Sequence, residues 1–461
     1  MAAKPTSPPP AYFLSLSLEN VRSFGEKQTI SFARKDGRPA QWTIILGDNG
    51  VGKTTVLKSL AVMRPSSVYP LKYPDGEEVY QPVFFADRRE EWIPSRSSHE
   101  GAGYISVNYD FGIDATHSQE IPPELWKNHY LSFRVDESGK YSGGGCSVYN
   151  IIHLGIVVYA YGAGRTTGNS TLSETPEAAD TCASLFDDRA DLLNPEEWFL
   201  NIDYGSKLAG SANTQLADAR DRVEKMLIDV LPGVTKIQIA AAGTPQKPQI
   251  SLQFLLHDTW VRLRDMSLGY QTLVVWLTDL ASKLYVRYPE SDNPLVEPAI
   301  VLIDEIDLHL HPKWQRELLS VLSGIFPETQ FIATAHSPLI VQAATDAEAN
   351  VVLLRREGDQ TIVVPDLEDV RNWRIDQIMT SELFGFETAR SPEAERMLKR
   401  RTELLNQLKL TAADKKELAH LTKQLGLENQ PVGETPSEKQ VHTVLQQLRQ
   451  KLGAKPTEQG A

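Results

Sequence analysis

The chain has 461 residues, 41% of them hydrophobic and 23% charged, which is enough for one large domain or two to three ordinary ones. Its apolar runs fall far short of the roughly 18 to 20 residues that span a membrane, so no membrane partner is predicted and a cytoplasmic protein is expected. The formal net charge of −13 argues against a surface that binds nucleic acid over its whole extent, since phosphate binding depends on Lys and Arg. A local basic patch could still contact DNA.

The N-terminal part, 13–95, is predicted to begin with two strands and then to form a strand, a loop and a helix. Residues 1–12 are rich in proline, and we expect a disordered leader there. Apolar and polar residues alternate over 13–21, and a second strand is predicted at 29–32. The apolar run 42–46 ends at Gly47, and apolar residues at helical spacing follow the glycine-rich loop: Val56, Leu57, Leu60 and Ala61.

The next stretch, 96–260, is predicted to be an inserted β/α lobe together with strands that return to the core. Polar and glycine-rich segments alternate there with strand-like ones such as 104–107. A buried strand is predicted at 153–160 and a helix at 216–230, with strands at 237–239 and 250–256.

Strands alternate with helices over residues 261–385, which are predicted to form the second part of the domain that begins with 13–95. Helices are predicted at 270–288, 313–322 and 338–343, and strands at 299–303, 330–333 and 351–354. This alternation is typical of an α/β protein with a mostly parallel sheet.

The last segment, 386–461, is predicted to be a helical tail of three elements. Ser391-Pro392 begins the first, and the second and third begin with the capping-box spacings of 411–414 and 435–438. Basic residues share one face of the first helix: Arg396, Lys399, Arg400 and Arg401. Acidic residues dilute this face, so a solvated surface is favoured over a nucleic-acid contact.

The glycine-rich loop after the strand at 42–46 carries the strongest motif of the chain. Gly47, Gly52, Lys53 and Thr54 have the spacing of a P-loop, in the required order of strand, loop and helix. Backbone N–H groups turn toward a phosphate in such a loop, and the helix that follows directs its positive end to the same anion. We therefore predict ATP and Mg²⁺ as cofactors, with the nucleotide bound by Asn49, Gly50, Val51, Gly52, Lys53, Thr54 and Thr55. Lys53 would contact the β and γ oxygens, Thr54 the Mg²⁺, and Thr55 the α-phosphate.

Two carboxylates end the apolar strand 299–303. Asp304 and Glu305 point to opposite sides if the strand continues, so the pair can serve two tasks. Asp304 would orient the Mg²⁺ shell and form the predicted metal site together with Thr54, and Glu305 would polarise the attacking water as a catalytic residue. The alternative is that both acids cap a strand end at the surface.

A histidine follows the next buried strand. His336 lies one β-α-β step after Glu305, at the strand end where α/β sheets bind their ligands. Its imidazole could hydrogen-bond the γ-phosphate or the water, which makes His336 the second catalytic candidate. A lone histidine at a strand end is more often structural, but the spacing after Glu305 favours the functional interpretation.

Taken together, these motifs resemble the ABC-type ATPases of the RecF, SMC and OLD branch. The resemblance includes 307–312 after the two acids, 334–338 around the histidine, and Leu268-Gly269-Tyr270-Gln271. It implies an ABC-ATPase head with a mixed, mostly parallel sheet, and a head-to-tail dimer with ATP between the P-loop of one copy and the signature of the other. Ser267 and Gly269 would belong to that signature, at a helix N-terminus.

Several further residues take their expected roles from the same resemblance. Arg22 matches a segment that lies by the nucleotide in similar ATPases, although a solvated arginine fits equally well. Arg165 belongs to a segment that recurs in bacterial defence ATPases and is a candidate for a position near the site, with a purely structural position as the alternative. Gln81 is a candidate for the Q-loop. The resemblance places His309 and His311 in the loop that contacts the other subunit. Their spacing is poor for a zinc site, so a metal site is not expected there.

Three segments resemble bacterial anti-phage defence ATPases of the Septu and retron-associated kinds: the strand 331–335 that leads to His336, residues 373–378, and Phe384-Gly385. The resemblance implies a sensor or assembly subunit that controls a separate effector such as a nuclease. The sequence shows no nuclease motif, so any cleavage would need such a partner. The alternatives are a RecF-like clamp for DNA repair and a nucleotide-gated scaffold with little turnover.

Overall fold

The computed structural model describes residues 11–63, 65–72, 78–84, 103–111, 129–135, 141–142, 157–165, 181–209, 214–244, 247–365, 367, 370–386, 389–405, 407 and 411–425. They divide into two compact units: one extends to Ile378 and includes Glu382–Phe384, and the other holds Met379–Ser381 and the chain from Gly385 onward. Within these described ranges, no helix is long and apolar enough to cross a membrane.

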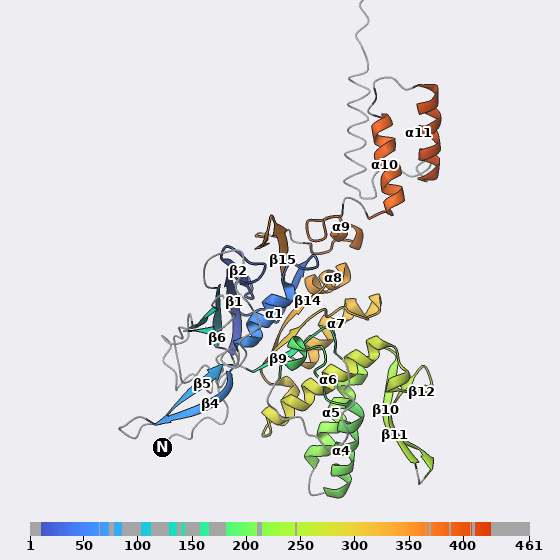
Figure 1. Ribbon diagram of the computed structural model, residues 1–461. Helices are drawn as coiled ribbons and strands as arrows, with labels where there is room; N and C mark the ends of the chain where they lie inside the picture. Colours follow the sequence, from blue (N-terminus) through green and yellow to red (C-terminus); the bar gives the residue numbers. More distant parts are fainter. Residues whose placement is uncertain are drawn as a thin grey trace, which may run out of the picture. The chain divides into compact units, whose positions relative to one another are not determined.

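A six-stranded sheet forms the core of the first unit (Figure 1). Its order is β16 (Gln360–Val363), β15 (Asn350–Glu357), β3 (Trp42–Gly47), β14 (Thr329–Thr334), β13 (Ala299–Ile303) and β9 (Val158–Tyr161). The last five are parallel to one another, and β16 pairs antiparallel with β15. The mixed, mostly parallel sheet predicted from the sequence is confirmed.

Both faces of this sheet are buried, which explains why its central strands are almost wholly apolar. Ile45, Leu302 and Ile332 point to one hydrophobic cluster. Other residues of the same strands, among them Trp42 and Phe331, point to the opposite face and belong to the other cluster. The rings of Trp42 and Phe331 stack there with centroids 4.2 Å apart. Because successive side chains of a strand point to opposite faces, the sheet packs against one hydrophobic layer on each face.

The first face is covered by α1 (Lys53–Val62) and by a second, antiparallel sheet. That sheet has the order β2 (Gln28–Ser31), β1 (Ala11–Glu19), β6 (Gly103–Phe111), β7 (His129–Val135) and β8 (Tyr141–Ser142). Ala11 pairs with Phe111 and is buried, so β1 begins two residues inside the predicted leader. A separate hairpin joins β4 (Pro65–Lys72) and β5 (Glu78–Phe84).

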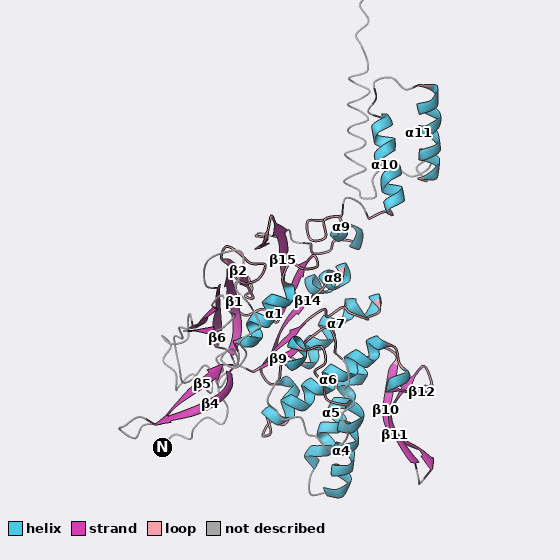
Figure 2. Cartoon of the chain, in the orientation of Figure 1, coloured by secondary structure: helices cyan, strands magenta, loops and turns pink. Residues whose placement is uncertain are grey.

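Helices cover the second face: α4 (Pro195–Ala209), α5 (Thr214–Val230), α6 (Leu268–Arg287), α7 (Pro312–Ile325) and α8 (Pro338–Asp346). Figure 2 shows α4, α5 and α6 beside a three-stranded sheet of β10 (Val234–Thr244), β11 (Lys247–Leu256) and β12 (Thr259–Arg262). Helix α4 was not predicted from the sequence. The predicted inserted stretch therefore supplies β6, β9, α4 and α5 to the layers of the head.

In the second unit, α10 (Pro392–Leu405) pairs with α11 (Ala412–Gln424). Thr411 and Asp414 form the predicted capping box at the start of α11. The guanidinium of Arg400 bonds both Glu417 carboxylate oxygens, and Arg401 donates to the hydroxyl of Thr422. These bonds support a solvated face over a free basic patch. The predicted third helix lies outside the described residues.

Candidate functional site

The P-loop is fixed in shape by two glycines that have no room for a side chain. Gly47 has φ +143° and ends β3, and a Cβ there would lie 2.3 Å from the carbonyl oxygen of Leu354 in β15. Gly52 has φ +95° and precedes α1, and a Cβ there would lie 2.6 Å from the Ser23 hydroxyl. The carbonyl of Val51 between them accepts a 2.9 Å bond from Thr361. Neighbouring strands thus hold the loop.

The side chain of Lys53, the first residue of α1, reaches back to this loop. Its ammonium donates to the carbonyls of Gly47 at 2.7 Å and Asp48 at 2.9 Å. Burial lowers the pKa of Lys53, although the carboxylates of Asp304 and Glu305 act in the opposite direction. The charge is therefore held where phosphate oxygens could accept its hydrogen bonds.

Asp304 joins three segments of the sheet edge. Thr54 donates to Oδ2 of Asp304 at 2.8 Å, and Thr334, the last residue of β14, donates to Oδ1 at 2.6 Å. The hydroxyl of Thr54 and this carboxylate are hard oxygen donors of the kind Mg²⁺ prefers. The described residues contain no group of three or more His, Cys, Asp or Glu that could hold a metal by itself. The donor set therefore fits an ion that takes its remaining ligands from nucleotide and water.

Glu305 has an unusual backbone. Its φ is +50°, a left-handed conformation that costs a non-glycine residue about 1–2 kcal/mol. Its N–H donates to the Thr334 hydroxyl at 2.7 Å, and its carbonyl accepts from Arg165 at 2.8 Å. This turn means that Asp304 and Glu305 do not simply alternate along an extended strand, as the sequence analysis assumed.

Arg165 follows β9 and is almost completely buried, at 4% exposed. It donates through Nη1 to the carbonyl of Asp304 at 2.9 Å and through Nη2 to that of Glu305. Burial lowers the pKa of Arg165 to about 10, so the guanidinium stays charged at neutral pH. Arg165 therefore contacts the backbone of the two acidic residues and not their carboxylates.

His336 lies at the same sheet edge, directly after β14. Its side chain is exposed, and its backbone N–H donates to Asp307 Oδ2 at 3.0 Å. His311 caps α7 by accepting from the N–H of Lys313, which gives it a structural role. His309 and His311 belong to no metal cluster within the described part of the chain.

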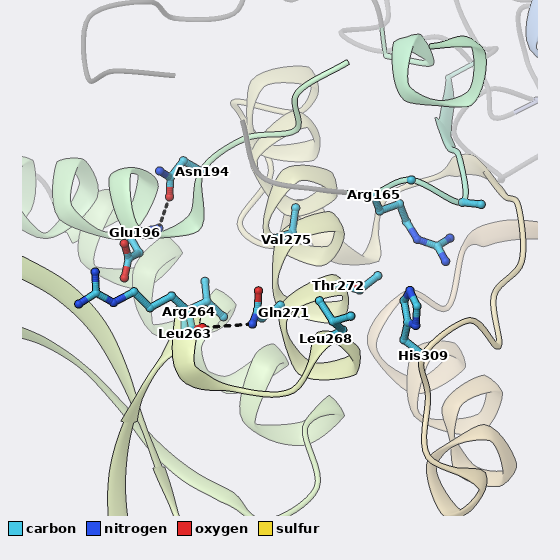
Figure 3. Close-up of a pocket in the computed structure, with 12 residues that line it drawn as sticks. Arg165, Asn194, Glu196, Leu263, Arg264, Leu268, Gln271, Thr272, Val275 and His309 are labelled. Atoms are coloured by element: carbon cyan, nitrogen blue, oxygen red, sulfur yellow. Dashed lines mark hydrogen bonds between the residues drawn. The ribbon is translucent and has the colours of Figure 1, made fainter. Parts of the chain in front are cut away.

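The signature candidate begins α6. Ser267 is the exposed N-cap and makes no side-chain capping bond, while Gly269 is buried. A Cβ on Gly269 would lie 2.5 Å from the carbonyl oxygen of His309, so this glycine allows the helix to approach the loop after Glu305. The atoms nearest to that Cβ position belong to His309 and to Trp314 of α7. A cavity of about 270 Å³ lies beside Leu268 and His309. Its lining also includes Arg165, Gln271, Thr272 and Glu196 of α4 (Figure 3).

Arg22 stands next to the P-loop. It is exposed with φ +48°, and its neighbours Ser23 and Phe24 contact the position of Gly52. Burial, and then the charge of Arg22, lower the pKa of Lys58 in α1. Gln81 lies in β5, where its side chain is not described.

Two residues of the site were given no role from the sequence. Thr334 is only part of the segment around His336, and Arg165 was a candidate for a position near the site without a stated chemical role. The one signal for Thr334 is a polar residue directly after the apolar run 331–333 of a fully buried strand.

The chain is similar in sequence to several known proteins. Residues 192–342 match the family described as "AAA domain, putative AbiEii toxin, Type IV TA system", and 15–63 match an "AAA domain" family. The Septu protein PtuA of Bacillus mycoides is 25% identical over 415 residues, 89% of this chain and 50% of that protein. The Retron Vc95 probable ATPase of Vibrio cholerae is 37% identical over 105 residues, 23% of this chain and 20% of that protein. The chain therefore spans half of the first relative and a fifth of the second.

Another Septu protein PtuA, from Bacillus thuringiensis, is 23% identical over 358 residues, 76% of this chain and 80% of that protein. Among solved structures, an SmcHead bound to the C-winged helix domain of ScpA has a TM-score of 0.42 at 16% identity, covering 77% of this chain and 97% of the other. RecF with ATP has a TM-score of 0.38 at 12% identity, covering 78% and 99%.

Proposed function

We propose that this chain, an ABC-type ATPase that resembles the Septu and retron ATPases of anti-phage defence, binds Mg-ATP at its P-loop and hydrolyses it with Glu305. The observation that carries the proposal is the hydrogen-bonded series from Thr54 through Asp304 to Thr334. It joins the P-loop helix to two neighbouring strand ends at one edge of the sheet. Ligands bind at that edge in α/β proteins.

The residues of the P-loop would hold the triphosphate. The backbone N–H groups of 49–52 and the positive end of α1 suit an anion, and Thr55 stands in the first turn of that helix. Lys53 would exchange its two carbonyl acceptors for phosphate oxygens. Thr54 and Asp304 would hold Mg²⁺, which when bound neutralises charge on the phosphates.

Glu305 would orient and polarise the attacking water. Thr334 and Arg165 hold the backbone of Glu305, so its side chain starts from a fixed position at the sheet edge. His336 follows the neighbouring strand, and its imidazole is exposed for a hydrogen bond to the γ-phosphate or the water.

A second copy of the chain would complete the site. Ser267 is exposed without a capping bond, and its neighbour Leu268 is 59% exposed at the start of a 20-residue helix. These features suit a helix N-terminus that meets the nucleotide of a partner, head to tail. ATP would then control association, and association would regulate a separate effector such as a nuclease.

The test compares Glu305→Gln with the wild type. We expect the variant to bind Mg-ATP but to release phosphate at least about 100-fold more slowly, because it lacks the base that polarises water. With ATP, the variant should also elute as a dimer on a sizing column while the nucleotide-free protein elutes as a monomer.

Equal turnover by both proteins would remove Glu305 from the mechanism, and unchanged elution would contradict the shared site. Loss of turnover with full biological activity would favour the nucleotide-gated scaffold. Purification of the native complex would identify the effector, and recovery of recombination proteins without a nuclease would favour a RecF-like role.

A further inference from the structure

We propose that Arg165 is a positioning residue, which fixes the left-handed turn at Glu305 and thereby aims the catalytic carboxylate at the water. The inference rests on the proposed hydrolysis by Glu305 and extends it to a residue on another strand. It concerns the rate of turnover and not the binding of ATP.

The hydrogen bonds of Arg165 are to two consecutive peptide groups. Nη1 and Nη2 donate to the carbonyls of Asp304 and Glu305 at 2.9 and 2.8 Å. These carbonyls lie before and after the φ and ψ rotations of Glu305, so a planar guanidinium that binds both restricts those rotations. Thr334 holds the intervening N–H at 2.7 Å. All three polar groups that define the turn are thus engaged.

The strand that carries Arg165 is itself anchored. β9 is parallel to β13, and the N–H of Asp304 donates to the carbonyl of Tyr161 at 2.8 Å. The hydroxyl of Tyr161 donates to Asp279 of α6 at 2.9 Å, and Lys283 pairs with the same carboxylate at 2.7 Å. The loop of Arg165 is therefore fixed to both the catalytic strand and the helix that begins with the signature.

A purely structural explanation is weaker. Arg165 as a whole is 4% exposed. Its guanidinium is bonded to carbonyls instead of a carboxylate and leaves Nε without a hydrogen-bond partner among the described residues. Burying a charge in this way is costly, and an apolar side chain of similar volume would fill the space at less cost. What an apolar side chain could not do is hold two carbonyls and place a positive charge near Asp304, Glu305 and Asp307, whose electrostatic effects reach this group.

The first experiment measures turnover and Mg-ATP binding for Arg165→Met and Arg165→Lys. We expect turnover to fall about 10- to 100-fold in the Met variant, since small misplacements of catalytic groups have effects of this size. The dissociation constant of a non-hydrolysable ATP analogue should change less than about threefold, because no bond of Arg165 reaches the P-loop. The Lys variant should fall between, because an ammonium group keeps the charge but not the fork.

A core variant controls for lost stability. Leu322→Ala removes a fully buried side chain of α7 and should lower the melting temperature without touching the turn. If it lowers turnover as much as Arg165→Met at a comparable melting temperature, Arg165 has no positioning role. Wild-type turnover by the Met variant, or parallel loss of ATP binding, also overturns the proposal.

Chemical rescue gives a readout that a structural role would not move. Arg165 lines the cavity beside Leu268 and His309, so solutes can reach the space that Arg165→Ala would open (Figure 3). Guanidinium, at concentrations far below denaturation, should restore part of the turnover of that variant, and urea should not. Equal effects of the two solutes contradict the proposal. Absence of turnover in the wild type would instead refute the proposed ATPase function.

Discussion

The hydroxyl of Thr334 donates a 2.6 Å hydrogen bond to the Asp304 carboxylate. The same oxygen accepts the N–H of Glu305, so one threonine on β14 sets the position of both acids that follow β13. The two strands are parallel neighbours, with Ile303 opposite Ala333, which brings their ends together. Thr334 thus connects the candidate metal ligand to the candidate base.

Replacing this threonine by valine keeps the side-chain shape but removes both bonds. We expect Thr334→Val to lower turnover about 10- to 100-fold and the free energy of unfolding by about 1–3 kcal/mol, because a buried carboxylate and a partly buried N–H each lose a partner. Phosphate release and urea denaturation measure the two effects. Thr334→Ser keeps the hydroxyl and should stay close to the wild type. A valine variant with normal turnover would show that Glu305 needs no such support.

Two glycines of the P-loop allow a matched comparison. Gly47→Ala would place a Cβ 2.3 Å from the backbone oxygen of Leu354, whereas Gly50, at φ +81°, has open space around its Cβ position. The first substitution should lower the free energy of unfolding by about 3 kcal/mol or more, and the second by only about 1 kcal/mol from the left-handed backbone. Thermal unfolding without nucleotide tests the order. Similar losses in the two variants would mean that β15 moves aside easily.

Removal of the metal should resemble removal of the Asp304 charge. For the wild type, chelating Mg²⁺ with EDTA should weaken ATP binding about tenfold, or ~1.4 kcal/mol, and abolish turnover. Asp304→Asn should bind ATP equally weakly with and without EDTA. Asp36→Asn, at an exposed carboxylate that pairs with Arg38, is the control and should respond like the wild type. If Asp304→Asn kept its full response to Mg²⁺, other residues would hold the metal.

The lowered pKa of Lys53 predicts a pH dependence of ATP binding. Burial favours the neutral amine in the free protein, while phosphates favour the charged form, so ATP binding raises the pKa of Lys53. Affinity is therefore full below the pKa of the free protein and falls as pH rises through it, at a pH below the ordinary lysine value. Titration of a fluorescent ATP analogue at alkaline pH measures this decline.

In Lys53→Arg the guanidinium stays charged over the same range, so the decline should disappear even if overall affinity is lower. A decline of the same shape in the arginine variant would assign it to another group.

Local features of the sequence determined a large part of the fold. The P-loop, the apolar strands 42–46, 299–303 and 330–333, and the capping box at Thr411 were predicted at or within a residue or two of their observed positions. Each depends on neighbouring residues: glycine spacing, runs of apolar side chains, and an N-cap with its partner three residues later. The mostly parallel sheet followed from the alternation of these strands with helices.

The support of the catalytic residues was decided only by tertiary structure. Arg165 meets Glu305 across 140 positions of the sequence, and Thr334 meets it across 29. The left-handed turn at Glu305 has no local signal, since glutamate does not favour it. The Glu305 carbonyl also accepts a local 3.1 Å bond from the N–H of Leu308, but the bonds from Arg165 and Thr334 come from distant segments. Sequence patterns name the residues that carry the chemistry because that chemistry needs particular side chains. Their orientation depends on how parallel strands bring their ends together, and that requires the folded sheet.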